Sequence, residues 1–480
     1  MSTETLYQNT DYNTIYNNLT EVPYTRSDII LTMQKIAPPG QEVLDTKTHH
    51  LLNHYTKSLL SLYLKSNMND YNRYESTEQR QIKISEEHLK NVHQNKTILV
   101  TGGTGLIGTK LMAELSKFNP SNIISVSRGL TIPLNIIDGV NYLHADIRDA
   151  TQINNIFSNE KPDIVYHVAA QKYPGLAEEM VIHTLSTNIT GTKNILNAVK
   201  NNDVERIIYA STGKTIRLFT PDTYAASKKI SEWLLSTFAT ANPNILCSAA
   251  RFTHVVDHSD IKRKLQTWID TDQPIKLHGP EIMFYVQSAI ESAQLLMNST
   301  LDSNKGTLQI DAIRDLGYPI SLTDLSLGLI NKNNNKGTLY FSGYTPGYEE
   351  EVYANTYDPK SAGEVSPLIN ALEARVTKTS DYSKEVDTFP LSSKQTPQSM
   401  KNFQALEQVY NNQSDKLSIN SLKNNLSWTI LEAQLLTVPT PIIERLASQV
   451  QKNEQINHKS LQNNLINQMI LNVFKKRFNK

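Results

Sequence analysis

Tyr224 and Lys228 are the two residues whose types and spacing most directly indicate chemistry. They stand four positions apart in the run YAASK at the start of an expected helix, so their side chains project from one helical face. The lysine ammonium is expected to lower the pKa of the phenol, which lets Tyr224 exchange a proton with a substrate hydroxyl. This chemistry suits the interconversion of an alcohol and a ketone. The alternative is a surface tyrosine and lysine on an ordinary helix.

A glycine-rich run, TGGTGLIG over 101–108, lies between an expected strand over 97–100 and an expected helix over 110–115. Glycines at 102, 105 and 108 allow a tight turn, close approach of the backbone to a pyrophosphate, and close packing of helix on strand. The N-terminus of the helix offers free N–H groups to the anion. In this strand–turn–helix context the run predicts a dinucleotide site, and the alternative is a structural turn.

Ser127 and Arg128 indicate which dinucleotide is bound. They end the second expected strand, where an acidic residue would bind the ribose 2′-hydroxyl of NAD. A hydroxyl beside a guanidinium suits a 2′-phosphate instead, so NADP is favoured, with NAD also possible. The alternative is that Arg128 faces solvent. Asp146 and Ile147 are expected beside the adenine, and Ala169 and Ala170 are expected to leave room for the cofactor backbone.

Short apolar runs from Lys96 onward alternate with helical patterns, which predicts strands buried on both faces and joined by crossover helices. The expected fold is therefore α/β, a Rossmann-type doubly wound parallel sheet with a smaller substrate-binding subdomain and extra N- and C-terminal helices. The expected divisions are a mainly helical extension over 1–94, a core over 95–355 (cofactor part 95–250, substrate part 251–355), a polar linker over 356–400 and helices over 401–480.

Composition excludes several other classes of function. Among the 480 residues, the 47 Lys and Arg balance the 47 Asp and Glu, so no overall field favours nucleic acid or an acidic membrane. Cys247 is the single cysteine, which excludes an intramolecular disulfide. No run of ~20 apolar residues predicts a membrane span, and a cytoplasmic location is expected. His49, His50 and His54 have no carboxylate or thiolate placed to complete a site, so no metal is expected.

Several motifs together resemble the extended short-chain dehydrogenases/reductases. Within that superfamily the chain most resembles the polysaccharide-biosynthesis branch that contains UDP-N-acetylglucosamine 4,6-dehydratases. The similarity extends from about Lys96 to Tyr353. The motifs that carry it are residues 101–108, Asp146–Asp149, Pro162–Ala170, Thr187–Thr192 and the pair of Tyr224 and Lys228.

The resemblance implies a bound NADP(H) or NAD(H) that takes a hydride from a sugar carbon and returns it. Tyr224 would be the acid/base, Lys228 would hold the nicotinamide ribose, and Thr212 would hydrogen-bond the reacting hydroxyl. Lys172 and Lys214 match family lysines near the substrate, and Lys214 would act as a base or as a phosphate or structural cation. The implied cofactor contacts are Gly102, Thr104, Gly105, Leu106, Ile107, Ser127, Arg128, Asp146, Ile147, Ala169, Ala170, Lys172, Asn188 and Lys228.

The substrate half departs from the family pattern. Gly213 stands where dehydratases of this branch have the aspartate that helps to expel water, and the spacing from Lys214 to Tyr224 is two residues longer than usual. Thr345 replaces an arginine expected to contact a diphosphate. The candidate substrate contacts in this half are Lys172, Arg251, His254 and His258, the last three with the alternative of a structural role.

The expected function is therefore an NAD(P)-dependent oxidoreductase or isomerase that transfers hydride at a carbinol carbon of a nucleotide sugar or related polyol. One alternative is a nucleotide-sugar 4,6-dehydratase in polysaccharide biosynthesis, and another is a catalytically silent NADP-binding scaffold. The amphipathic terminal helices are expected to mediate self-association or to cover the site, so a homo-oligomer is expected.

Overall fold

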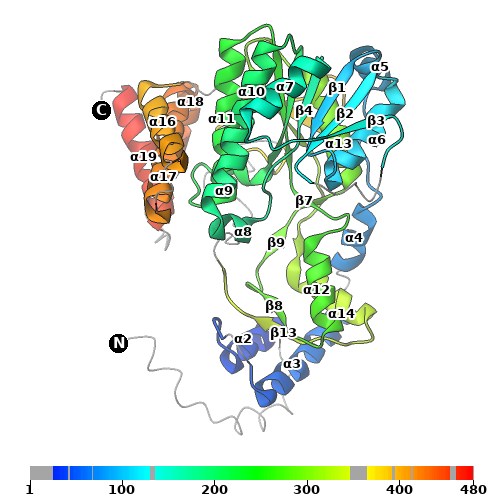
Figure 1. The fold of residues 1–480 in the computed structure, drawn as a ribbon. Coiled ribbons are helices and arrows are strands. Elements are labelled where there is room, and N and C mark those ends of the chain that lie inside the picture. Colours follow the sequence, from blue (N-terminus) through cyan, green and yellow to red (C-terminus); the bar gives the residue numbers. More distant parts are fainter. Residues whose placement is uncertain are drawn as a thin grey trace. The chain divides into compact units, whose positions relative to one another are not determined.

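The computed structural model describes residues 25–41, 44–66, 69–129, 136–345, 365–391, 395–411, 415–453 and 461–478. The chain divides into two compact units, whose elements are labelled in Figure 1. The first contains the chain up to Tyr71 together with Ile261–Ile282 and Ser321–Gly343. The second contains Asn72–Asp260, Met283–Ile320 and the chain from Tyr344 onward.

The second unit is built on a sheet of nine strands within the described residues. These strands are β1 (Thr97–Thr101), β2 (Asn122–Ser127), β3 (Val140–His144), β4 (Ile164–His167), β5 (Arg206–Thr212), β6 (Leu246–Phe252), β11 (Leu308–Ile313), β14 (Lys378–Thr379) and β15 (Val386–Leu391). Their order is β14-β15-β11-β6-β5-β4-β1-β2-β3, and all neighbours from β11 to β3 are parallel. The predicted doubly wound parallel sheet is confirmed.

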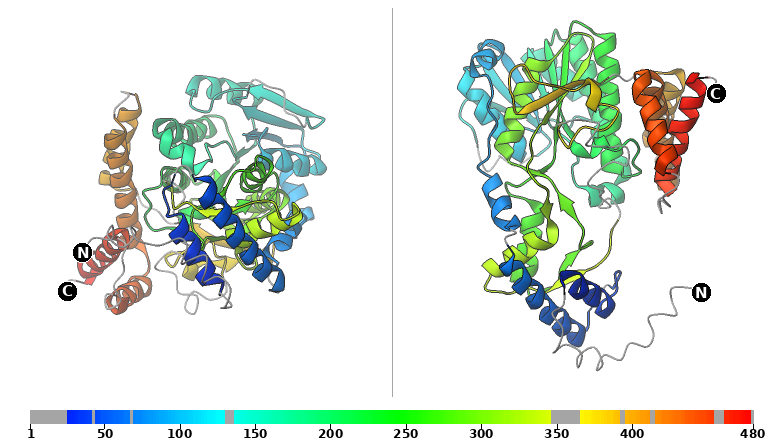
Figure 2. Two further views of the ribbon diagram at one scale, coloured as in Figure 1. Left: turned by 90° about the horizontal axis from the view of Figure 1, so that it is seen from below. Right: turned by 180° about the vertical axis from the view of Figure 1, so that it is seen from behind.

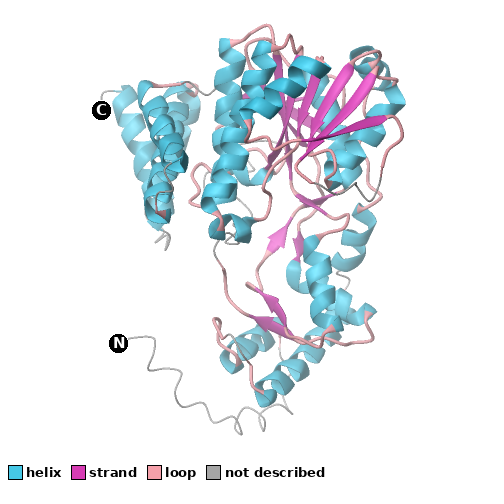
Figure 3. Ribbon diagram, in the orientation of Figure 1, coloured by secondary structure: helices cyan, strands magenta, loops and turns pink. Residues whose placement is uncertain are grey.

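Helices cover both faces of this sheet, as Figure 3 shows. One group contains α5 (Glu86–His93), α6 (Leu106–Leu115) and α13 (Ala289–Asp302), and the other contains α7 (Ala150–Glu160), α10 (Gly191–Asn201) and α11 (Thr223–Ala241). Central strand residues such as Ile98, Leu99 and Val100 have no exposed surface, because helices lie above and below them. The strand order reverses between β1 and β4, so residues at the carboxyl ends of β1, β4 and β5 meet at one edge.

The first unit combines N-terminal helices with elements from the predicted substrate part. It contains α2 (Arg26–Ile36), α3 (Thr46–Lys65), most of α12 (Asp260–Asp270), α14 (Leu322–Lys332) and the parallel strands β8 (Ile275–Leu277) and β13 (Leu339–Phe341). The Leu339 amide donates to Thr56 Oγ1 at 2.9 Å, and the Tyr340 hydroxyl donates to the Pro38 carbonyl at 3.0 Å. The structure therefore does not separate the N-terminal helices at residue 94 as the sequence predicted.

Part of the predicted polar linker over 356–400 is instead a strand of the main sheet. Within that segment β15 pairs antiparallel with β11 from Val386 to Leu391, and its gold ribbon faces the viewer in the rear view of Figure 2. Asp387 and Thr388 are polar residues of this segment, yet both have no exposed surface. Arg314 pairs with the Asp387 carboxylate at 2.7 Å, which satisfies the buried charge.

The C-terminal helices α16 (Pro397–Asn411), α17 (Lys416–Thr437), α18 (Thr440–Asn453) and α19 (Leu461–Phe478) belong to the second unit. Phe403, Leu406 and Leu426 share an apolar cluster with Ile230 and Trp233 of α11. Among the described residues, no helix is both long and apolar enough to cross a membrane.

The remaining short elements are η3 (Ser116–Phe118), α4 (Asp70–Thr77), α8 (Pro174–Glu179), α9 (Val181–Leu185), η4 (Ser186–Thr190), η5 (Gly213–Ile216), β7 (His254–Val255), β9 (Met283–Phe284), β10 (Val286–Gln287), β12 (Ile320–Ser321) and η6 (Ala374–Val376).

Candidate active site

The glycine-rich loop connects β1 to α6 with little space to spare. Gly102 has a φ of +72°, and a Cβ atom there would lie 2.8 Å from the Ala169 backbone. A Cβ on Gly108 would lie 2.4 Å from the Gly102 carbonyl oxygen. Thr104 and Gly105 are exposed, and Gly105 is the N-cap of α6. No side chain fits at Gly102, where the loop packs on the residues that follow β4. The exposed part of the loop and the N-terminus of α6 together form a surface that suits an anion.

Cationic side chains gather beside the end of β2. Arg128 is exposed, and its guanidinium lies 3.3 Å from Nε2 of His183, while a guanidinium nitrogen of Arg148 lies 3.1 Å from Nδ1 of the same ring. Burial and both arginines lower the pKa of His183. A neutral imidazole accepts at one nitrogen, so it cannot satisfy both guanidinium groups. Asp146 pairs with Arg148 at 2.6 Å, which leaves the cluster with an excess of positive charge.

The other predicted cofactor residues line the same edge of the sheet. Ile147 follows β3 and is 6% exposed, while Ala169 and Ala170 follow β4 and are half-buried. Leu106 and Ile107 open α6 and are also half-buried. In contrast, Lys172 is exposed, with Nζ 5.2 Å from the centre of the Tyr173 ring.

Asn188 connects the end of β4 to α11. It lies in the π-helical turn η4, and its amide nitrogen donates to the Gln171 carbonyl at 3.0 Å and to Ser227 Oγ at 2.8 Å. Its amide oxygen accepts from the Gln171 N–H at 2.8 Å. π-Helical turns inside helices are frequent at functional sites. Asn188 therefore joins Ser227, the residue before Lys228, to Gln171 in the loop that follows β4.

Tyr224 and Thr212 meet beside the carboxyl end of β5. Thr212 is the last residue of that strand, and Tyr224 lies in the first turn of α11, close enough for the Thr212 side chain to lower the pKa of the phenol. Burial raises the pKa of Tyr224 to about 12, the hydrogen bond from Thr212 opposes that rise, and the charge of Asp222 adds to it. The structure thus brings two predicted catalytic residues together, but the phenol pKa lies above its ordinary value rather than below it.

Lys228 lies one turn along α11 and is 3% exposed. Its ammonium donates to the Ala210 carbonyl of β5 at 2.8 Å and lies 4.6 Å from the centre of the Tyr209 ring. Burial lowers the pKa of Lys228 to about 7, and the charge of Glu232 partly opposes this. The pKa of Tyr224 is set by burial, Thr212 and Asp222, and the Lys228 ammonium is not among these influences.

Gly213 and Lys214 follow Thr212 in η5. A Cβ on Gly213 would lie 2.6 Å from Cδ2 of Leu368, so Leu368 fills the space that a side chain at position 213 would need. Lys214 Nζ lies 4.0 Å from the carboxylate of Asp222, the N-cap of α11. Burial raises the pKa of Asp222, while the positive charge of Lys214 lowers it. A buried carboxyl and an ammonium therefore lie beside the N-terminus of the helix that carries Tyr224.

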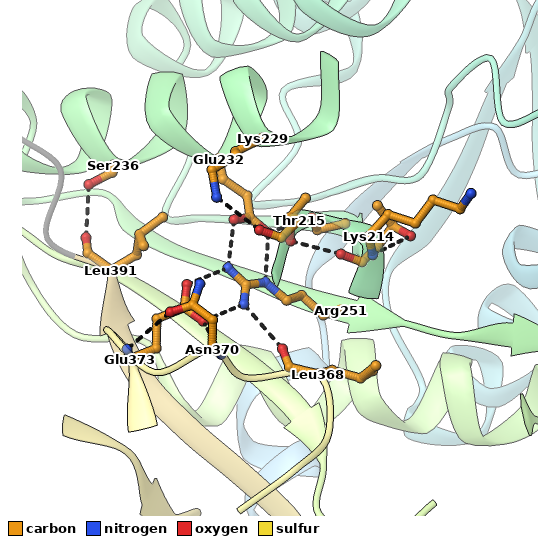
Figure 4. A network of polar contacts seen from close by, with 12 residues as sticks. Lys214, Thr215, Lys229, Glu232, Ser236, Arg251, Leu368, Asn370, Glu373 and Leu391 are labelled. Carbon is orange, nitrogen blue, oxygen red and sulfur yellow. Dashed lines mark hydrogen bonds and ion pairs between the residues drawn. The ribbon is translucent and has the colours of Figure 1, made fainter. Parts of the chain in front are cut away.

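Arg251 lies inside the protein and has no exposed surface. Its guanidinium pairs with Glu232 of α11 at 2.8 Å and with Glu373 at 2.7 Å, and it donates to the Leu368 carbonyl at 3.1 Å (Figure 4). The five donors of the guanidinium are thus committed to neighbours in the interior. Of the two roles that the sequence left open, the geometry favours the structural one over contact with a substrate.

The remaining predicted substrate residues lie apart from this network. His254 is half-buried in β7, with its ring centre 4.7 Å from that of Phe284. His258 is exposed in a turn with a φ of +45°. Thr345 is exposed, and the motif that follows it from Pro346 lies outside the described residues. These residues stay predictions.

Three residues of the site did not stand out in the sequence. Glu232 accepts from Ser211 at 2.6 Å, from Thr215 at 3.0 Å and from Arg251, which makes it the centre of the buried polar network. Asp222 had a usable signal, since an aspartate just before a helix is a preferred N-cap. His183 had none, because its role depends on two arginines from other parts of the chain.

The sheet order, the glycine-rich loop and the Tyr224 and Lys228 pair define an extended short-chain dehydrogenase/reductase fold. A family model described as polysaccharide biosynthesis protein matches residues 98–355, which is more than half of the chain. The chain therefore belongs to that family.

Similarity to individual proteins agrees with this assignment. The capsular polysaccharide biosynthesis protein CapD of Staphylococcus aureus is 28% identical over 287 residues, covering 56% of this chain and 47% of CapD. The probable polysaccharide biosynthesis protein EpsC of Bacillus subtilis (strain 168) is 24% identical over 332 residues, covering 65% of this chain and 54% of EpsC. This chain thus spans about half the length of the curated relatives it matches.

A solved structure matches the fold. The X-ray structure of Pen from Bacillus thuringiensis matches with a TM-score of 0.52 and 22% sequence identity, over 63% of this chain and 89% of Pen. At this identity the match shows the fold alone.

Proposed function

We propose that the protein is an NAD(P)-dependent oxidoreductase or isomerase that acts on a nucleotide sugar or a related polyol. The observation that carries this proposal is the place of Tyr224 in the first turn of α11, beside Thr212 at the end of β5 and one turn before buried Lys228. The group stands at the same sheet edge as the glycine-rich loop. A binding scaffold has no physical need for such a proton-transfer group beside a dinucleotide loop.

The residues present fit a nicotinamide dinucleotide. The crowding at Gly102 and Gly108 keeps the loop backbone close to β4, and the exposed N-terminus of α6 suits a pyrophosphate. Lys228 would hold the nicotinamide ribose, and Asp146 with Ile147 would lie beside the adenine. When bound, the cofactor accepts a hydride from a carbinol carbon and can return it.

NADP is the dinucleotide that we favour. The cluster of Arg128, Arg148 and His183 holds more donors and positive charge than its one carboxylate, Asp146, can satisfy. A 2′-phosphate would supply the missing acceptor oxygens and negative charge. The hydroxyl of Ser127 accepts a long hydrogen bond from the Thr104 amide at 3.4 Å, which places it beside the loop.

Proton transfer would be the work of Tyr224. A phenol with a pKa of about 12 is protonated at neutral pH, so it can donate to the oxygen of a carbonyl that is being reduced. In the oxidative direction the hydrogen bond from Thr212 and the nearby Lys228 ammonium would stabilise the phenolate that accepts the hydroxyl proton. Lys214 and Asp222 supply an ammonium and a carboxyl beside the same helix N-terminus.

Elimination of water from the sugar is the second candidate. It needs a proton donor for the departing hydroxyl, and Gly213 has no side chain to supply one. The carboxyl of Asp222 favours this candidate, because burial raises its pKa and so favours the protonated form, against the opposing effect of the Lys214 charge. Mass analysis of the product separates the two candidates, since only elimination lowers the mass by one water.

The test incubates the full chain with NADP+ or NAD+ and with UDP-glucose or UDP-N-acetylglucosamine. We expect near-ultraviolet absorbance from reduced nicotinamide, or an altered sugar product. Replacing Tyr224 with Phe should lower the rate by about 10²–10⁴-fold, because it removes the transferable proton. Tyr318→Phe, at a side chain that is 82% exposed, is the matched control and should keep the wild-type rate. Equal rates for Tyr224→Phe and wild type would contradict the proposal and favour a scaffold.

A further inference from the structure

The segment that leads into Tyr224 is covered by a helix more than 190 residues later in the chain. Helix α17 lies beside α11 in the second unit (Figure 1). The Trp428 ring of α17 stacks on Phe219 with centroids 3.8 Å apart and planes 9° from parallel. Leu218 and Phe219 also share an apolar cluster with Leu431 and Leu435. The segment before Tyr224 is thus packed against α17 rather than against the sheet alone.

Lys423 is the polar residue of this contact. It is 1% exposed, and its ammonium donates to the Pro221 carbonyl and lies 3.5 Å from Thr223 Oγ1. Burial lowers the pKa of Lys423 to about 8, while the carboxylates of Glu178 and Asp222 raise it and Lys416 lowers it further. An ammonium at this depth is costly unless its partners hold it. An apolar side chain would pack here without that cost, so stability alone does not explain a lysine.

The contacts of Lys423 converge on the first turn of α11. Thr223 is the first residue of that helix, and its amide donates to Glu178 Oε1 at 2.6 Å. Asp222 accepts from the Ala225 amide at 2.7 Å and so caps the helix. Tyr224 lies between Thr223 and Ala225, whose amides make these two hydrogen bonds. The carbonyl of Pro221 and the hydroxyl of Thr223 therefore set the path of the backbone that carries the phenol.

We propose that Lys423 is a positioning residue for Tyr224, which it holds toward Thr212 by fixing Pro221 and Thr223 from α17. This inference rests on the proposed function, in which Tyr224 transfers the proton. The inference gives the C-terminal helices a part in the reaction, because α17 packs against the segment that leads into Tyr224. A displacement of about 1 Å in such a group can cost about 10²-fold in rate.

The test compares full-length Lys423→Met with wild type. Methionine fills a similar volume without the charge or the donor, so the fold is expected to be kept. We expect kcat for the oxidation of UDP-N-acetylglucosamine with NADP+ to fall by about 10²-fold, with KM changed less than about twofold. Hydrogen–deuterium exchange should rise in the peptide over 217–226. The control is Glu407→Gln, which breaks the ion pair of α16 with Lys193 and should change neither measurement.

Chemical rescue separates positioning from packing. In Lys423→Ala, added n-propylamine can enter the vacated space and restore an ammonium, so it should recover part of kcat. An amine that recovers nothing, or a Lys423→Met variant with wild-type kcat and wild-type exchange, would overturn the inference. If Lys423→Met does not fold, Lys423→Leu, which also lacks the charge and the donor, takes its place in the same measurements.

The exchange measurement keeps this test separate from that of the proposed function. If wild type turns over no nucleotide sugar, the proposed function fails. The response of residues 217–226 to Lys423→Met then decides whether Lys423 fixes the first turn of α11. Raised exchange confined to that peptide supports the contact, and unchanged exchange overturns it.

Discussion

Arg128 is the residue whose side chain decides the cofactor preference that we propose. Its guanidinium is exposed at the end of β2 and lies beside the ring of His183. If it contacts a 2′-phosphate, Arg128→Ala should weaken binding of NADP+ by about 10–100-fold, because a hydrogen bond to a charged group contributes about 1.5–3 kcal/mol. Binding of NAD+ should hardly change. Calorimetric titration with both dinucleotides measures the difference, and Lys305→Ala, which removes an exposed positive charge elsewhere, is the control. Equal weakening of both would contradict the assignment.

At the same scale, the sequence could predict where residues lie when the pattern is local, while their chemical roles stay predictions. The glycines of the loop, the Thr212 strand end and the Tyr224 and Lys228 spacing are all encoded within short runs, so their placement at one sheet edge could be predicted. The raised pKa of Tyr224 and the interior role of Arg251 could not, because burial depends on residues far away in the chain. The contact of Leu368 with Gly213 could not be predicted either, because the two residues lie far apart in the chain.

At the scale of elements, Arg251 joins three parts of the second unit. It lies on β6 and pairs with Glu232 of α11 and with Glu373, which precedes η6. Lysine cannot reproduce the paired geometry of the guanidinium, so Arg251→Lys leaves buried carboxylate oxygens unsatisfied. We expect a loss of about 1–3 kcal/mol in the free energy of unfolding. Urea midpoints at an unchanged slope measure this loss.

The control for this prediction is Lys193→Gln, which breaks a partly exposed ion pair with Glu407. Such a pair contributes about 0–1 kcal/mol, so its midpoint should stay near that of wild type. Equal losses in the two variants would show that the three elements do not depend on Arg251. Strand β15 was not predicted because two of its buried residues, Asp387 and Thr388, are polar. Their burial is tolerable because Arg314 and the Ser366 amide bond Asp387, and Gln309 bonds Thr388.

At the scale of the whole molecule, the two units divide the chain in a way that no local pattern indicates. The strand and helix order of the core could be predicted from alternating apolar runs. The joining of α2 and α3 with segments more than 200 residues later depends on long-range contacts such as that between Thr56 and Leu339. The N-terminal helices therefore form one unit with part of the expected substrate region rather than a separate extension.

Acid stability is a property of the second unit as a whole and depends on histidines that must stay neutral. His93 has no exposed surface, and burial lowers its pKa to about 4. Its Nδ1–H donates to the Leu89 carbonyl, and its Nε2 accepts from the Tyr166 hydroxyl at 2.7 Å. His167 at the end of β4 has a pKa lowered to about 3 for the same reason. Because these values lie below the ordinary 6.5, the unfolded chain binds more protons between pH 4 and 6.5.

The contribution of His93 to stability is thus complete above about pH 6.5 and is lost as the pH falls toward 4. Buried Asp302 and Asp311, whose pKa values are raised, act in the opposite sense, so the test uses a difference between variants. Relative to His93→Gln, wild type should lose on the order of 3 kcal/mol of unfolding free energy over this range. Urea unfolding at pH 7 and at pH 4.5 measures it, with His88→Gln, at an exposed residue of α5, as the control. A constant difference at the two pH values would mean that His93 does not stay neutral inside the fold.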